Sequence, residues 1–492
     1  MGTAGFDTSR DYRMTIGLEI HVQLKTESKM FCGCSTRYGA PPNTQVCPVC
    51  LGMPGVLPVM NKRAFEFAVK TALALDCTIA KFTKFDRKSY YYPDLPKNYQ
   101  ISQYDLPLSH DGFLEIETSQ GRRKIGITRV HLEEDAGKLL HTSAATSSVD
   151  LNRTGIPLME IVSEPDIHST EELHEYVSAL RLLVTYLDVS NCNMEEGNIR
   201  VDANISVQTD ADGREISSPI SEIKNMNSFS ACEKAMAFEA DRLYRRLNEG
   251  ITRETHPKET RGWDEERGVT VGQRQKEEAS DYRYFPDPDL APVVVDAEWL
   301  AKIRAEIPEL PQHRRRRFIE QYGLSEYDTD VLLADRRLAD YFEELVKETD
   351  DPRTSCVWVT QYVLRELNDR KLTIEEFPVT PARLAGPIQL VADHTISSST
   401  ASSTVLAEMI ESGKSAREIV EEKGLAQVSD VSALDATVDA VIRKFPREVE
   451  QFRSGKQGIL NFLVGMVMKE TKGKANPQMV RELLKKKLGR DA

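Results

Sequence analysis

Several features that would assign a class at once are absent from the 492-residue sequence. No stretch approaches the roughly 18 apolar residues of a membrane-spanning helix, which argues against a helical membrane protein. Residues 1–13 lack the apolar core of a signal peptide, so we expect a cytoplasmic protein in a reducing compartment. The motifs G-x-G, G-x-x-x-x-G-K-[ST] and G-x-S-x-G are also missing. Their absence excludes the glycine-rich phosphate loops and the serine-hydrolase elbow.

Positive charge is scarce overall but not everywhere. The net charge is −13, which argues against a generally basic nucleic-acid coat. The segment 443–492 nevertheless holds 13 Lys or Arg against five Asp or Glu, a net of +8, which leaves −21 for the other 442 residues. This asymmetry predicts an acidic body with a basic tail that can meet an anion such as RNA, although a solvated helical face is an equally good interpretation.

The length suggests about two to four domains. Two segments, 16–24 and 198–208, alternate apolar and polar residues and predict half-buried strands. Helical spacing predicts helices over 61–75, 170–186 and 230–248, and after residue 295 the pattern is helical to the end. The sequence therefore predicts an α+β fold, with a strand-rich part followed by helical parts.

Four of the eight cysteines follow the spacing C-x-C-x12-C-x2-C. They are Cys32, Cys34, Cys47 and Cys50. Two close pairs of thiolates can form a tetrahedron around Zn²⁺, and four protein ligands leave no open position, so the role would be structural. An iron–sulfur cluster is the alternative. The other four cysteines are most simply buried or incidental thiols.

Four segments place acids beside His, Lys, Arg or amide side chains. They are Glu19 with His21, the run 129–135 with Glu133 and Glu134, Arg200 with Asp202, and Glu222 with Lys224. If these segments share a sheet, their polar faces converge. Clustered carboxylates repel one another unless a cation lies among them, which favours Mg²⁺, with Arg200 and Lys224 near phosphate oxygens. A solvated outer sheet face with ion pairs is the competing interpretation for each strand taken alone.

A tyrosine-rich and basic segment lies at 84–100, and a shorter one lies at 281–287. Tyrosines beside Lys and Arg can stack on bases and contact phosphate. A proline-bounded loop that packs its tyrosines against the body is the alternative.

The sequence resembles the GatB family, one of the components of tRNA-dependent amidotransferases. Long motifs in one order carry the resemblance. They are 16–24 (IGLEIHVQL), 84–88 (KFDRK), 91–94 (YYPD), 98–103 (NYQISQ), 131–138 (HLEEDAGK), 150–153 (DLNR), 160–166 (EIVSEPD), 194–197 (MEEG), 202–206 (DANIS), 224–225 with 227–228, 281–286 (DYRYFP) and 473–477 (GKANP).

The resemblance implies three domains: a cradle with a kinase-like site over 1–298, a helical domain over 299–410 and a tail domain over 411–492. It implies a ligase that phosphorylates the side-chain carboxylate of misacylated Glu-tRNA(Gln) or Asp-tRNA(Asn) with ATP. Ammonia from glutamine then gives the amide. The implied partners are an amidase, GatA, and a small clamp, GatC. The lack of a transit peptide favours a bacterial cytoplasm.

The resemblance also implies site residues. The Mg²⁺ site would involve Glu19, His21, Glu133 and Glu134, with Glu134 as the strongest candidate. The strand-face argument adds Asp202 and Glu222 as cofactor-binding residues and Arg200 and Lys224 to the catalytic set. The four cysteines support Zn²⁺ here. The tail resembles a tRNA-reading module, which makes Lys472, Lys474 and Asn476 candidate tRNA contacts.

Two other functions stay open. A non-catalytic, zinc-containing tRNA-binding scaffold would share the cysteines and the basic tail, but it would give the acidic cluster no role. A free-standing Mg²⁺-dependent ligase for a small molecule would not need the tail or the tyrosines. The sequence does not choose between Glu-tRNA(Gln) and Asp-tRNA(Asn).

Overall fold

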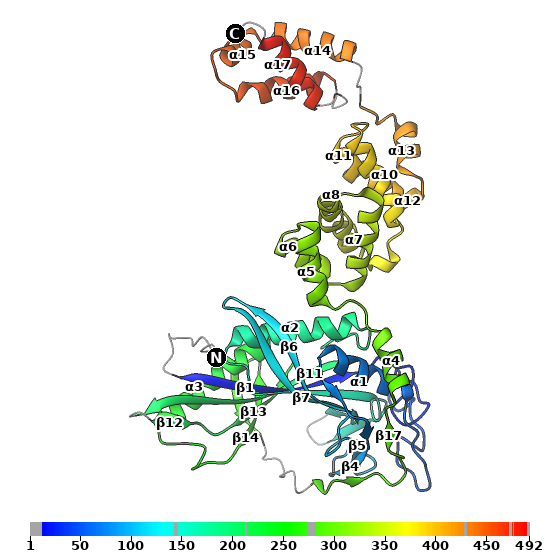
Figure 1. Cartoon of the computed structure of the whole chain (residues 1–492), viewed down its shortest axis with the longest axis vertical. Helices are drawn as coiled ribbons and strands as arrows, with labels where there is room; N and C mark the ends of the chain where they lie inside the picture. The colour runs from blue at the N-terminus through cyan, green and yellow to red at the C-terminus, as the bar shows by residue number, and fades with distance from the viewer. Residues whose placement is uncertain are drawn as a thin grey trace. The chain divides into compact units, whose positions relative to one another are not determined.

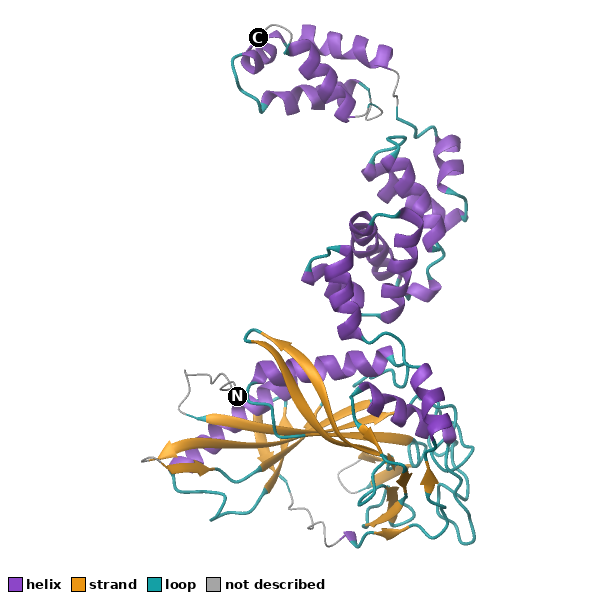
Figure 2. Ribbon diagram, in the orientation of Figure 1, coloured by secondary structure: helices purple, strands orange, loops and turns teal. Residues whose placement is uncertain are grey.

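The computed structural model describes residues 12–141, 146–211, 214–273, 282–427, 431–471, 475 and 477–489. The chain forms two compact units, Met1–Pro311 and Gln312–Ala492. Strands dominate the first unit, whereas the described residues of the second unit are helical or in loops (Figure 2). The predicted α+β class is therefore confirmed. In the described part of the chain, no helix has both the length and the apolar character to cross a membrane.

A large sheet organises the first unit, with the strand order β15-β14-β13-β11-β1-β10-β7-β5-β4-β16. Its central strands are β1 (Arg13–Gln23), β7 (Gly121–Glu134), β10 (Pro157–Ser163), β11 (Ile199–Ala211) and β13 (Ser221–Met226). Its other strands are β2 (Thr78–Ile79), β4 (Asp86–Ser89), β5 (Tyr99–Ser102), β6 (Ser109–Thr118), β12 (Arg214–Ser217), β14 (Glu259–Asp264), β15 (Val269–Gly272) and β16 (Phe285–Pro286). Two small sheets pair β3 (Phe82–Thr83) with β17 (Val293–Val294) and β8 (Lys138–His141) with β9 (Ser147–Asp150).

The alternation in β1 decides which face of the sheet is buried. Ile16, Leu18, Ile20 and Val22 are buried, whereas the residues that alternate with them are only partly covered. Burying a side chain of this size contributes roughly 1.5–3 kcal/mol. A slip of one residue would turn these apolar side chains to the polar face, so the burial fixes the register.

Three helices cover the first unit, close to the ranges that the sequence predicts. They are α1 (Lys62–Ala74), α2 (Thr170–Tyr186) and α3 (Phe229–Asn248). Asn61, Ser169 and Ser228 cap their first turns by accepting backbone N–H bonds. Helices α2 and α3 pack on each other and against β6 and β11 (Figure 1). The apolar face of the sheet is therefore closed, and its polar face stays available for a site.

Helix α4 (Ala297–Ala305) also belongs to the first unit. Its Trp299 stacks on Phe65 of α1, with the ring centroids 5.3 Å apart. The predicted domain boundary after residue 298 therefore falls inside a helix that packs on the sheet unit. The boundary after residue 410 falls within α12 (Leu406–Ser412). The three-domain division stays a prediction.

The second unit is built of short helices. They are α5 (Pro311–Tyr322), α6 (Glu326–Leu333), α7 (Arg336–Thr349), α8 (Pro352–Val357), α9 (Leu364–Arg370), α10 (Pro381–Ala392), α11 (Ser398–Thr400), α12, α13 (Ala416–Lys423), α14 (Val431–Lys444), α15 (Pro446–Arg453), α16 (Ile459–Glu470) and α17 (Pro477–Leu488). π-helical turns at η2 (Trp358–Val363) and η4 (Ala401–Val405) and a 3₁₀ turn at η3 (Ile374–Glu376) complete it. Helices α14–α17 share their own apolar core, which includes Val438, Leu463 and Leu484.

Candidate active site

The polar face of the central sheet is hollowed into a cavity of about 910 Å³. Strand register places its charged residues opposite one another. Glu19 of β1 lies opposite Asp202 of β11. His21 lies opposite Arg200 of β11 on one side and Glu160 of β10 on the other. The charged and imidazole side chains that line the cavity are Glu19, His21, Lys88, Arg129, His131, Glu133, Asp135, Glu160, Arg200, Asp202, Glu222, Lys224 and Lys258.

Three of these side chains form what we call the His21 cluster: His21, Glu133 and Glu160. The Nε2 atom of His21 lies 3.6 Å from Glu133 Oε1 and 3.5 Å from Glu160 Oε2. One ligand atom from each residue lies within 4.8 Å of the other two. His131 adds a further contact, with its Nε2 3.2 Å from Glu160 Oε2. These groups are close enough to share one cation.

The electrostatics of the cluster favour an ionised Glu160. Burial opposes protonation of His21, but its hydrogen bond to Glu160 and the nearby negative charges raise its pKa. Burial would raise the pKa of Glu160, yet the charge and hydrogen bond of His131 and those of His21 hold it well below its usual value. Glu19 stands beside the cluster and accepts a hydrogen bond from Asn204.

The donor set of the His21 cluster fits a divalent cation. Two carboxylate oxygens suit Mg²⁺, which is usually held by one or two carboxylates together with substrate phosphates. An imidazole nitrogen also suits Zn²⁺, and the carboxylates also suit Mn²⁺. The buried Nδ1 of His131 has no hydrogen-bond partner among the described residues. This wall of the cavity therefore contains a polar atom that a ligand could bind.

Glu134, the strongest predicted candidate for the Mg²⁺ site, lies outside the His21 cluster. Its carboxylate pairs with Lys97, both side chains being only 5% exposed. It also accepts the backbone N–H of Ile101 at 3.1 Å. Successive residues of a strand point to opposite faces, so Glu133 faces the cavity and Glu134 faces the cysteine loop. Of the two neighbouring acids, Glu133 is the one that reaches His21.

The other predicted residues line the cavity but are engaged with one another. Arg200 pairs with Asp135. Lys224 pairs with Asp202 and, at 2.8 Å, with Glu222. Both cations are therefore already neutralised by carboxylates. The structure brings these predicted residues into the cavity, although it does not leave Arg200 or Lys224 without an ionic partner.

Tyrosines from both predicted aromatic segments meet at the cavity. Tyr90, Tyr104, Tyr282 and Tyr284 line it. The rings of Tyr104 and Tyr284 stack with centroids 4.0 Å apart, and those of Tyr90 and Tyr282 meet edge to face. Aromatic rings of this kind can stack on a base. The packing is consistent with both predicted roles of these segments. The tyrosines pack on one another, and they also border the cavity, where they could stack on a base.

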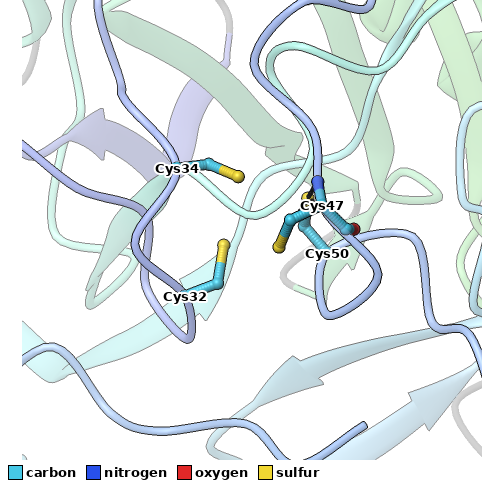
Figure 3. A group of neighbouring side chains, drawn as sticks. All are labelled: Cys32, Cys34, Cys47 and Cys50. Carbon is cyan, nitrogen blue, oxygen red and sulfur yellow. Dashed lines mark hydrogen bonds between the residues drawn. The ribbon is translucent and has the colours of Figure 1, made fainter.

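The four predicted zinc ligands come together from two loops. One ligand atom from each of Cys32, Cys34, Cys47 and Cys50 lies within 4.8 Å of the others. Figure 3 shows their sulfur atoms gathered around a common space. A hydrogen bond from Cys32 lowers the pKa of Cys50 to about 5 against the opposing effect of burial. The arrangement fits a closed tetrahedral site.

A buried lysine provides an independent test of that fit. Lys29 is fully buried, and its Nζ lies 3.7 Å from the sulfur of Cys50. The ammonium also donates to the carbonyl oxygens of Gln45 and Leu151. A buried cation is costly without a negative partner, and a metal held by four thiolates carries net negative charge. Lys29 therefore matches a tetrathiolate site.

The predicted tRNA contacts Lys472, Lys474 and Asn476 lie outside the described residues.

The sequence reasoning assigned no individual role to four residues of the site: Lys88, Arg129, His131 and Glu160. Lys88 lies in the predicted segment 84–100, and Arg129 and His131 lie in the predicted run 129–135. Glu160 could have been recognised from the sequence, because it is the single acid within the apolar strand Pro157–Ser163. An acid that interrupts such a strand must find a partner or a ligand. The other three could be assigned only after the strands were paired.

Known proteins resemble this chain along almost its whole length. The family model described as the GatB/GatE catalytic domain matches residues 14–301, and the one described as the GatB domain matches residues 340–488. The GatB-type component of the aspartyl/glutamyl-tRNA(Asn/Gln) amidotransferase of Carboxydothermus hydrogenoformans is 53% identical over 98% of this chain and all of its own length. Its counterpart in Moorella thermoacetica is 52% identical over 97% of this chain and all of its own length.

The cavity, the cysteine site and most of the motifs behind the resemblance lie within the first matched range. The matches cover both compact units, and the relatives align end to end. The chain therefore belongs to the GatB family of tRNA-dependent amidotransferase components.

Proposed function

We propose that this chain is the carboxylate-activating subunit of a tRNA-dependent amidotransferase. It uses ATP to phosphorylate the side-chain carboxylate of Glu-tRNA(Gln), Asp-tRNA(Asn) or both, and the product is the amide. The observation that carries the proposal is the His21 cluster at the wall of a 910 Å³ cavity, in a chain of this family. A cavity of this size suits the reacting ends of two large substrates.

The chemistry requires help because a carboxylate cannot lose oxide when ammonia attacks it. In the first step a carboxylate oxygen attacks the γ-phosphorus of ATP, and ADP leaves with the electron pair of the broken P–O bond. In the second step ammonia attacks the acyl carbon, phosphate leaves, and one proton is released. Two anions must approach each other in the first step, so positioning and positive charge carry most of the catalysis.

The residues of the cavity match these needs. His21, Glu133 and Glu160 would hold a divalent cation, for which we propose Mg²⁺, and it would offset the charge of the reacting anions. Glu19, Asp202 and Glu222 form the outer acidic wall. The Tyr90–Tyr282 and Tyr104–Tyr284 pairs would border a base. An acyl phosphate hydrolyses in water, so ammonia should reach it by an enclosed route.

The cysteine site has a structural role in this proposal. Zn²⁺ held by four thiolates would brace the loops around Cys32 and Cys50. One side of this site borders the Glu134–Lys97 pair. The strand that carries Glu134 also carries Glu133, so a rigid loop would help to hold Glu133 toward the cavity.

The partners follow from the division of labour. The sequence lacks the G-x-S-x-G hydrolase elbow, so ammonia would come from a GatA-type amidase, with a GatC-type protein as a clamp. The tail over 443–492, with its net charge of +8, is the proposed RNA-binding surface. The bacterial cytoplasm stays the predicted compartment.

Reconstitution with the amidase and clamp proteins tests the proposal. We expect Gln-tRNA or Asn-tRNA only when misacylated tRNA, ATP and an ammonia source are all present. Testing each tRNA separately also identifies the substrate. Equal product with and without ATP would overturn the proposal.

A non-catalytic tRNA-binding scaffold is the second function to test. It would bind tRNA and zinc but would show no ATP hydrolysis stimulated by misacylated tRNA. Uncharged tRNA is the control, because it presents the same RNA without the carboxylate.

A further inference from the structure

The cations that line the cavity fall into two groups. Arg200 is paired with Asp135, and Lys224 is paired with Asp202 and Glu222. Lys258 also belongs to this group, since its Nζ lies 3.5 Å from Glu222 Oε2. A ligand anion could reach these cations only in competition with carboxylates a few ångströms away. Their charge is already neutralised inside the protein, and they are poor candidates for a primary anion site.

Lys88 and Arg129 differ from this first group. Among the described residues, neither has a carboxylate within ion-pair distance. The Nε atoms of Arg129 and Arg200 are both buried without a hydrogen-bond partner there, but Arg200 has its ion pair with Asp135, whereas Arg129 has none among the described residues. The ammonium of Lys88 lies over the ring of Tyr282, 5.2 Å from its centroid. Buried donors are nearly always satisfied in folded proteins, so an unsatisfied guanidinium nitrogen in a cavity wall indicates a missing acceptor.

Both cations stand beside the His21 cluster. Arg129, His131 and Glu133 are alternate residues of β7 and all line the cavity. Lys88 lies on β4, and its ammonium over the Tyr282 ring also lines the cavity. A ligand on this wall would meet a cation-binding cluster and two positive side chains together.

This combination suits a phosphoryl group. A transferred phosphoryl spreads negative charge over three oxygens, and enzymes stabilise that charge with a metal ion and with Lys or Arg. A glycine loop is absent from the sequence, so side chains must supply these contacts. We propose that Lys88 and Arg129 are the phosphate-binding cations of the cavity and that they hold the terminal phosphates of ATP.

The proposal rests on the proposed function, and it moves the phosphate-binding role from Arg200 and Lys224 to Lys88 and Arg129. Its test uses the full chain assembled with its partner proteins. Affinity is measured by calorimetry for a non-hydrolysable ATP analogue with Mg²⁺, for adenosine, and for uncharged tRNA. The variants are Lys88→Gln and Arg129→Gln, with Arg129→Lys as the conservative replacement.

Each neutral variant should weaken binding of the ATP analogue about tenfold or more, the effect of one charged hydrogen bond. Adenosine and tRNA should bind as they do to the wild type. Arg129→Lys should recover part of the loss, because it restores the charge. Arg122→Gln is the matched control, since Arg122 lies on the same strand and pairs with Glu117 at the surface.

Three outcomes would overturn the proposal. Unchanged affinity for the analogue would exclude a phosphate contact. Equal losses for the analogue and adenosine would indicate damage to the cavity rather than loss of a phosphate ligand. Weaker tRNA binding with unchanged analogue binding would assign the cations to the RNA backbone. Failure of the proposed function is a separate result, because it would appear in the wild type as amide formation without ATP.

Discussion

The sheet unit and the helical unit both bury charged side chains, but they neutralise them differently. In the helical unit, Arg314 is only 5% exposed and pairs with Asp340 and Glu343. Arg317 and Tyr322 bind the same Glu343. In the sheet unit, two cavity cations have no carboxylate partner among the described residues. A charge that finds its partner inside its own unit stabilises the fold, whereas one left open toward a cavity indicates a ligand.

Removal of a carboxylate from the His21 cluster should have the largest effect on activity. We expect Glu133→Gln or Glu160→Gln to lower the rate of transamidation by about 10²–10³-fold, because each deletes a ligand of the proposed cation. The melting temperature of Glu133→Gln should change little, since removal of this acid relieves repulsion with Glu160. Glu160→Gln should melt somewhat lower, because it loses the ion pairs with His21 and His131. Product formation and thermal unfolding measure the two effects.

The exposed Glu164 also lies close to β10 and provides a control. Glu164→Gln should keep the wild-type rate, because its carboxylate only accepts a hydrogen bond from Thr128. Wild-type activity in both cluster variants would show that these acids are a structural group like Glu343.

The second prediction concerns Lys29, a buried cation of the sheet unit that does have a negative neighbour. Lys29→Met should weaken zinc binding by about 10–100-fold, the usual effect of losing a group that supports a metal ligand. Metal content after dialysis against a graded chelator measures it. Cys34→Ser should lose the zinc more completely, and Cys77→Ala should retain it. Undiminished zinc affinity in Lys29→Met would assign the lysine to packing alone.

The third and smallest effect belongs to the helical unit. Glu343→Gln should lower the free energy of unfolding by about 2 kcal/mol, since Arg314 and Arg317 lose a negatively charged partner. It should not slow catalysis. Burial opposes ionisation of Glu343, but hydrogen bonds from Arg317 and Tyr322 and the charge of Arg314 lower its pKa to about 2.

The lowered pKa of Glu343 gives a pH dependence with a definite sign. Its contribution is complete above the unfolded value near 4.5 and is lost as the pH falls toward 2. Denaturant titrations of the wild type and Glu343→Gln should therefore converge over that range. Glu344→Gln, on the exposed side of the same helix, is the control. A constant difference between wild type and Glu343→Gln down to pH 2 would contradict the assignment.

The sequence alone was sufficient for two central strands of the sheet and for the three helices that cover it. The alternation over 16–24 predicted β1, and helical spacing predicted α1, α2 and α3 to within one or two residues at their ends. These patterns are local, because the apolar periodicity of a strand or helix is visible within a short stretch of consecutive residues. The cysteine spacing was also readable, since two close pairs limit the possible ligand sets.

The sequence could not decide between Glu133 and Glu134. Both are acids at the end of one strand, and only the pairing of β7 with β10 shows which one points to the cavity. Glu160 gained its role because it lies opposite both His21 and His131. The contact with His21 joins residues more than a hundred positions apart, and no local pattern encodes it.

The class of fold, the metal-type cysteine spacing, the charged tail and the family resemblance could all be read from the amino-acid sequence, because each is a property of composition, spacing or ordered motifs. Only the folded chain shows which acids lie close enough to share a cation and which cations lack a carboxylate partner among the described residues. Ion pairing across a sheet depends on register and on the face each side chain takes, and the packing of distant strands sets both.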